Sequence, residues 1–140
     1  MWVHEHAAET VVPREKVWAA LADINSWTAW DTSMAEIKLD GPFAVGSTVS
    51  MTPIGQDPIR STIVEIEDGT TYADETEFGG VTLRFSHNLT ELPDGITRIT
   101  HRLEITGDAA DTVGPEIGPV ITADFPHAMH ALIAYAGKLA

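Results

Sequence analysis

The chain has 140 residues and no cysteine, and 44% of its residues are hydrophobic and 21% charged, which is typical of a globular domain without disulfides or thiolate metal sites. We therefore expect one domain over residues 1–140. The formal net charge of -13 would repel nucleic acids and anionic membranes, so neither is expected as a partner. No apolar run approaches the roughly 20 residues of a membrane helix and no signal peptide is evident, so we expect a cytoplasmic protein.

The first predicted element is a strand over residues 2–11. Its alternation places Trp2, His4, His6 and Ala8 on one face and acidic residues on the other. The side chains of the first group are therefore expected to point inward.

Two short helices are predicted to follow this strand. Pro13 suits the first turn of a helix, and Asp23 and Ser26 are candidate caps of a second helix that ends near Trp30. Trp27 and Trp30 lie three residues apart there, and they either plug one end of the core or line one end of a cavity. We expect Trp27 to be a core residue with a local acceptor for its indole N–H, whereas Trp30 fits either role.

From Met34 the period changes to two, which predicts six more strands. Glycine- and proline-containing turns separate them, for example Asp40-Gly41-Pro42 and Pro93-Asp94-Gly95. The predicted strands are 34–39, 47–53, 59–67, 70–78, 81–91 and 96–106.

After Gly107 a helical period continues to the end of the chain. Pro126 is expected to kink or divide this helix, and His127 and His130 project away from its apolar stripe. The stripe consists of Ile121, Phe125, Ala128, Met129, Leu132, Ala136 and Leu139. The order of elements predicts an α+β domain in which the helix packs against the sheet.

Three strings carry a resemblance to a known family. They are VPREKVWAALADINSWTAWD, GPFAVGSTVSM and FPHAMHALIAYAGKLA. The first is similar to the pattern P-x-x-x-V-W…L-x-D…W-x-x-W of the START-like (SRPBCC) superfamily, and within it the chain resembles the polyketide cyclase/dehydrase group. The resemblance implies a helix-grip fold: a seven-stranded antiparallel curved sheet around a long C-terminal helix, with two short helices after the first strand and an apolar cavity inside. It implies no cofactor and no metal, and the family spans carriers, receptors, cyclases and co-chaperone-like proteins.

The hairpin at Pro93-Asp94-Gly95 fixes a register. A three-residue loop with glycine in the left-handed position pairs Leu92 with Ile96. Continued along the strands, this register places His87 opposite His101 on the apolar face, and Arg84 opposite Glu104 on the polar face.

Two histidines on an apolar face need hydrogen-bond partners. They could satisfy each other structurally, hold a ligand, or act as catalytic general bases, so His87 and His101 are candidates for each role. If His4 and His6 also point inward, several histidines could converge, but the resemblance brings no metal with it and we expect none.

The strand over 70–78 adds polar candidates. Tyr72, Asp74 and Thr76 share a parity that we expect to face inward. The arginines at 84, 98 and 102 all fall on the outer parity, and the lack of an interior arginine weakens the cyclase interpretation.

These patterns predict binding of a small apolar or aromatic molecule, polyketide- or lipid-like, in an internal cavity by a monomer or homodimer. The alternatives are a polyketide cyclase or dehydratase with a histidine general base, and a co-chaperone-like interaction module. The residues expected to line the cavity are Trp30, Tyr72, Asp74, Phe85, His87, His101, Leu103, Phe125 and Met129.

Overall fold

The computed structural model describes residues 1–139. The elements in chain order are β1 (Trp2–Thr10), α1 (Arg14–Ala22), η1 (Ile24–Ala29), β2 (Met34–Asp40), β3 (Thr48–Pro53), β4 (Ile59–Glu67), β5 (Thr71–Phe78), β6 (Val81–Leu92), η2 (Pro93–Gly95), β7 (Ile96–Thr106), α2 (Ala110–Thr122) and α3 (Phe125–Gly137). Strand existence and order are as the sequence predicts, and the strand boundaries agree closely.

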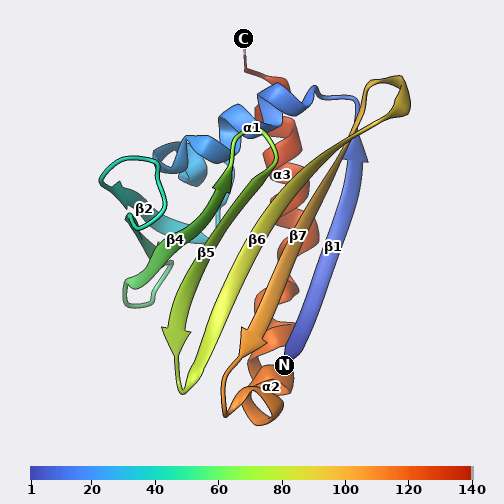
Figure 1. Ribbon diagram of the computed structural model, residues 1–140. Helices are drawn as coiled ribbons and strands as arrows, with labels where there is room; N and C mark the ends of the chain where they lie inside the picture. The colour runs from blue at the N-terminus through green and yellow to red at the C-terminus, as the bar shows by residue number, and fades with distance from the viewer. Residues whose placement is uncertain (140) are drawn as a thin grey trace.

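The strands form one antiparallel sheet in the order β1-β7-β6-β5-β4-β3-β2. Register shifts in β2 and β4, between Met34 and Glu36 and between Ile63 and Glu65, mark irregularities of the kind that bend a sheet. The helices α2 and α3 pack against β1 and β7, and α1 packs against α3. Figure 1 shows α3 running behind the curved sheet, with α1 at one end and α2 at the other. This arrangement is the predicted α+β helix-grip fold.

The terminal helix is divided, as Pro126 predicts. The break falls between Thr122 and Phe125, and Pro126 lies in the first turn of α3, where its missing N–H removes no helical hydrogen bond. Met129 and Leu132 are fully buried as expected. The apolar stripe predicts that Phe125 is buried as well, but it is only half-buried, because it stands directly at the break.

The predicted cap of the second short helix is wrong in its chemistry. Asp23 occupies the N-cap position of η1, but its side chain makes no capping hydrogen bond. Instead the Ser26 hydroxyl donates to the Asp23 carbonyl at 2.7 Å. Trp27 follows the prediction for a core residue, because its indole N–H donates to the Leu21 carbonyl at 3.0 Å.

The β6–β7 hairpin has the predicted register. Leu92 pairs with Ile96, and His87 pairs with His101. The loop differs in one detail, because Asp94 as well as Gly95 adopts a positive φ, of 67° and 75°. Aspartate tolerates this left-handed conformation better than most residues with a side chain.

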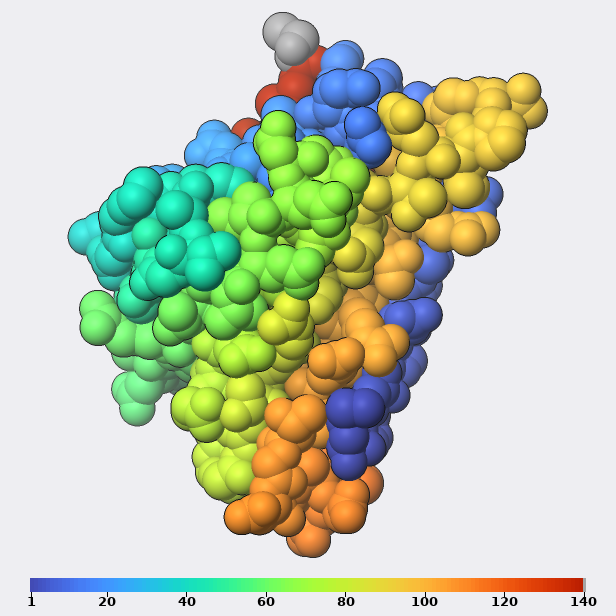
Figure 2. Space-filling view, in the orientation of Figure 1, coloured from blue at the N-terminus to red at the C-terminus, as the bar shows by residue number. Residues whose placement is uncertain are grey.

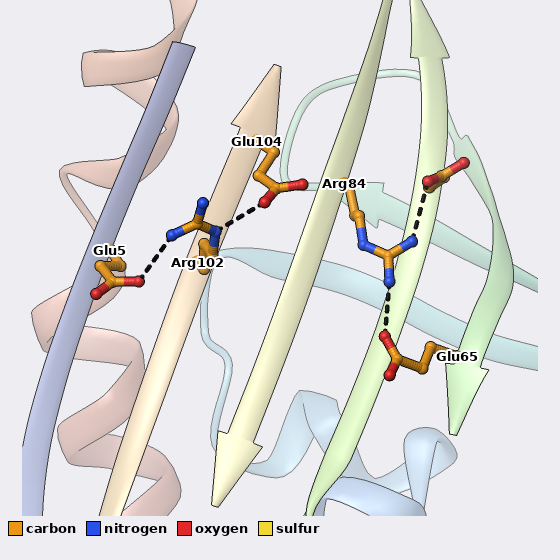
Figure 3. Close-up of polar contacts among 6 residues, drawn as sticks. Glu5, Glu65, Arg84, Arg102 and Glu104 are labelled. Carbon is orange, nitrogen blue, oxygen red and sulfur yellow. Dashed lines mark hydrogen bonds and ion pairs between the residues drawn. The ribbon is translucent and has the colours of Figure 1, made fainter. Parts of the chain in front are cut away.

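The outer face of the sheet corrects one predicted ion pair. Arg84 and Glu104 are register partners, as expected, but each bonds to other residues. Arg84 and Arg102 each reach two carboxylates, and none of these contacts joins Arg84 to Glu104 (Figure 3). The observed pairs are Arg84–Glu65 (2.7 Å), Arg84–Glu75 (3.2 Å), Arg102–Glu104 (2.8 Å) and Arg102–Glu5 (3.0 Å). In Figure 2 this outer face forms one surface across β4, β5, β6, β7 and β1.

Candidate functional site

A row of polar side chains crosses the inner face of four neighbouring strands. His6 of β1 pairs with His101 of β7, His101 pairs with His87 of β6, and His87 pairs with Tyr72 of β5. Tyr72 and His101 are buried, with 0% and 3% exposure, whereas His6 and His87 are half-buried. Antiparallel registers therefore bring four distant segments of the sequence into one line.

Aromatic rings surround this row. The His87 and His101 rings pack edge to face with their centroids 4.3 Å apart. Tyr72 and Trp27 also contact the His87 ring, at 5.8 and 5.9 Å between centroids. Phe125 of α3 packs against His101 at 6.1 Å. The polar row thus lies within an aromatic interior.

Asp74 lies beside this row on β5. It is 2% exposed, and its Oδ2 accepts a hydrogen bond of 2.7 Å from the Tyr72 hydroxyl. Burial raises the pKa of Asp74 to about 6, because the charged form is poorly solvated, although the hydroxyls of Tyr72 and Ser61 act in the opposite direction. Burial and the neighbouring Asp74 carboxylate both raise the pKa of Tyr72, so its phenol stays protonated.

The pKa values of the two inner histidines are lowered, in contrast to that of Asp74. Burial lowers the pKa of His87 to about 4. Burial, followed by the nearby imidazoles of His87 and His6, lowers the pKa of His101 well below its usual value. Both rings are therefore neutral near pH 7, each with one N–H donor and one acceptor nitrogen.

Four buried polar atoms have no hydrogen-bond partner among residues 1–139. They are the Trp30 Nε1, Asp74 Oδ1, His87 Nδ1 and His101 Nε2 atoms. Most buried polar side-chain atoms in proteins are paired, and leaving one unpaired costs about 1–3 kcal/mol. All four belong to residues that the sequence places among the cavity-lining set.

The other expected lining residues lie on the same inner face or on the helix. Leu103 and Met129 are fully buried, whereas Phe85 is half-buried although its parity points inward. Phe43 is an additional aromatic residue of the site, and its ring stacks on Tyr72 with the centroids 5.9 Å apart and an angle of 12° between the planes. Phe43 lies in the loop between β2 and β3, where strand parity gives no signal.

His4 faces the terminal helices, as its strand parity predicts, but it is not buried. Its backbone pairs with Leu103, an inner-face residue, yet its side chain is exposed. The reason is that the covering helix is interrupted there, and the His4 ring lies against the rings of Trp2 and Phe125, at 6.2 and 6.3 Å between centroids. Within the part of the chain that the structure describes, no three His, Asp or Glu side chains are grouped so as to hold a metal ion.

A surface hollow of about 390 Å³ opens at the junction of α2 and α3. It is lined by Trp2, His4, Pro119, Thr122, Ala123 and Pro126. A second hollow, of about 480 Å³, lies on the polar outer face between β1 and β7 and includes Glu5, Glu9 and Arg98. Only the first hollow adjoins the aromatic interior, because Phe125 contacts His4 on one side and His101 on the other.

The sequence matches the family described as "Polyketide cyclase / dehydrase and lipid transport" over residues 1–137. The chain belongs to this family. No curated protein sequence is significantly similar to it. No helix among residues 1–139 is long and apolar enough to cross a membrane.

Solved structures share the fold at low sequence identity. A START superfamily protein from Mycobacterium smegmatis has a TM-score of 0.78 at 10% identity, covering 99% of both chains. A protein from Thermobifida fusca, solved by NMR, has a TM-score of 0.80 at 16% identity, covering 99% of this chain and 95% of its own. Norcoclaurine synthase from Thalictrum flavum, in complex with dopamine and hydroxybenzaldehyde, has a TM-score of 0.67 at 12% identity, covering 99% of this chain and 88% of its own. At these identities the likeness establishes the helix-grip fold of the START superfamily.

Proposed function

We propose that this protein binds a small, planar, apolar or aromatic molecule carrying one or two oxygen atoms between the inner face of the sheet and the terminal helices. The observation that carries the proposal is the set of unpaired buried atoms of Trp30, Asp74, His87 and His101. Such atoms provide donors and acceptors for ligand oxygens, and the surrounding rings provide the apolar contact area.

The family membership and one structural neighbour support this class of ligand. The family description includes lipid transport and cyclase/dehydrase activity, both of which act on largely apolar molecules. Norcoclaurine synthase was solved with dopamine and hydroxybenzaldehyde, which are small aromatic molecules that carry oxygen.

Leucine substitutions at the two inner histidines test the proposal. If His87 and His101 hold the ligand, then His87→Leu and His101→Leu weaken binding of planar phenols and ketones by about 1–3 kcal/mol while the unliganded proteins stay as stable as the parent or gain stability. Thermal-shift screening of the wild type and both variants measures this, and the exposed His130→Leu on α3 serves as a matched control. Lower stability with unchanged affinity would assign the pair a structural role instead.

A second candidate function is catalysis of enolisation, and the protonation equilibrium of Asp74 favours it. A carboxyl with a pKa of about 6 and one free oxygen is suited to accept and return a proton near neutral pH, whereas an imidazole with a pKa of about 4 is a weaker base. Asp74 Oδ1 would take a proton from the carbon next to a ketone. The C–H electron pair would form the C=C bond, and the carbonyl π pair would move to oxygen, where a histidine N–H donates.

Deuterium exchange into 2-tetralone tests this second function. NMR in D₂O should detect protein-catalysed exchange at the carbons next to the carbonyl, and Asp74→Asn should lower its rate by roughly 100-fold or more. Exchange that does not depend on the protein, or that continues at the same rate in Asp74→Asn, would contradict the catalytic function, and binding would be the only function proposed.

A further inference from the structure

The inner face of the sheet is open to solvent at His4. His4 has the register of an inner-face residue, opposite Leu103, but its side chain is exposed. The hollow of about 390 Å³ lies over it, at the break between α2 and α3. A volume of this size suits a one- or two-ring molecule.

One side chain separates this hollow from the inner histidines. The Phe125 ring lies 6.3 Å from the His4 ring and 6.1 Å from the His101 ring, measured between centroids. His101 in turn contacts His87 at 4.3 Å. Phe125 therefore lies between His4 at the hollow and the contacting pair of His101 and His87.

The walls of the hollow are held firmly. Trp2 packs directly on the backbone of α2, because a Cβ at Gly114 would lie 2.6 Å from the Trp2 Cβ and one at Gly118 would lie 2.5 Å from its ring. The Thr122 hydroxyl donates to the Gly118 carbonyl at 2.9 Å. Phe125 lies behind these walls, as the first residue of α3 directly after the helix break, and its ring is only half-buried, so it is less confined than the fully buried side chains of α3.

We infer that the hollow at the α2–α3 break is the entrance to the interior site, and that Phe125 is the gate between the Trp2–His4 surface and the His87–His101 pair. This inference rests on the proposed function for its ligand, a planar aromatic molecule. Such a molecule stacks first on Trp2 and His4 and then passes the Phe125 ring.

The first test measures access to His101 without any ligand. Diethyl pyrocarbonate reacts with neutral imidazole: a ring nitrogen attacks a carbonyl carbon, the N–C bond forms as the anhydride C–O bond breaks, and the leaving ethyl carbonate takes up the imidazole proton and decomposes to ethanol and CO₂. Phe125→Ala should raise the rate of modification at His101 by about tenfold, which corresponds to a barrier lowered by about 1.4 kcal/mol. Peptide mass spectrometry follows each site, and His127 and His130, both exposed on α3, should keep their rates.

Phe125→Trp supplies the opposite change, since a larger ring should slow modification of His101. An unchanged rate at His101 in both variants would overturn the gate. Equal acceleration at every histidine in Phe125→Ala would also overturn it, because the protein would then be opening as a whole.

The second test measures ligand kinetics with 2-naphthol as the fluorescent probe, by stopped flow. A gate changes association and dissociation by the same factor, so Phe125→Ala should raise both rates by about tenfold and leave Kd within about twofold. Phe78→Ala, which removes an exposed ring at the last residue of β5, should change neither rate.

A higher Kd from faster dissociation alone would make Phe125 a wall of the binding site and contradict the gate. If 2-naphthol does not bind to the wild type, the proposed function fails for this ligand class, and the modification rates still decide the access route.

Discussion

Burial shifts the pKa of Asp74 and the pKa values of the inner histidines in opposite directions. It raises the pKa of the carboxyl toward neutrality and lowers the pKa of both imidazoles, so all three groups favour their uncharged forms. The interior is therefore polar but nearly free of charge below about pH 6, which suits recognition of neutral oxygen-bearing molecules.

Asp74→Asn should stabilise the protein at neutral pH. The folded protein holds the Asp74 proton up to a pKa of about 6, whereas the unfolded chain releases it near the usual 3.8. Stability is thus full below about pH 4 and falls as the pH rises to about 6, by up to about 3 kcal/mol. Urea unfolding should show Asp74→Asn more stable than wild type at about pH 7.5, with the difference closing at about pH 4. A constant difference at both pH values would contradict the buried-carboxyl account.

The double variant His87→Leu/His101→Leu should lose sensitivity to acid. The unfolded chain protonates these histidines below their usual pKa of 6.5, but the folded protein resists protonation of His87 down to about 4. Stability contributed by the neutral pair is present above about pH 6.5 and decreases as the pH falls toward 4. Unfolding curves of the wild type should therefore shift to lower denaturant across this window, whereas those of the double variant should shift less. Parallel curves would show that the imidazoles are not buried in solution.

At this scale the sequence identifies which face a residue occupies but not how far that face is covered. Strand parity and the hairpin loop were sufficient to place His87 opposite His101 and to turn Tyr72 and Asp74 inward. Parity also predicts that His4 lies on the inner face, and its pairing with Leu103 agrees. Its side chain is nevertheless exposed, because the covering helix breaks at this position. Such coverage is a tertiary property that no local pattern encodes.

At the scale of elements, the division of the terminal helix organises the site. Pro126 indicated the division, but the fit between α2 and β1 was not visible in the sequence, because it depends on Gly114 and Gly118 meeting Trp2 from the opposite end of the chain. The ion pairs of Arg84 with Glu65 on β4 and Glu75 on β5 could not be predicted from the sequence either, because they depend on how three strands lie side by side.

Gly114→Ala should destabilise the protein although alanine favours helix. The new Cβ would lie 2.6 Å from the Trp2 Cβ, which is fixed to its backbone, so α2 or β1 must shift. We expect a loss of about 1–3 kcal/mol. The control Gly137→Ala, whose Cβ would lie 3.5 Å from a Val12 methyl, should be neutral or stabilise by about 0.4–1 kcal/mol. If both variants gained stability equally in urea unfolding, the close contact of α2 with β1 would be wrong.

Leu132→Ala should cost about 2–5 kcal/mol, because this α3 side chain is fully buried in the core. Val120→Ala, on the exposed side of α2, should change stability by less than about 0.5 kcal/mol. Chemical denaturation compares the two. A loss of stability below about 1 kcal/mol for Leu132→Ala would indicate that α3 does not pack against the sheet as described.

At the scale of the whole molecule, the helix-grip fold explains why the candidate functional side chains lie on one face of the sheet. The outer face satisfies its arginines with carboxylates, while the inner face collects histidines, a tyrosine and an aspartate among aromatic rings. The family and the structural neighbours establish this architecture.

Native mass spectrometry of the protein titrated with 2-naphthol tests the central claim most directly. The wild type should form a saturable complex with one molecule per chain, and the His87→Leu/His101→Leu variant should bind at least roughly tenfold more weakly. His130→Leu should bind as the wild type does. A wild-type protein that forms no saturable complex, or a double variant that binds equally well, would contradict the interior site proposed for this protein.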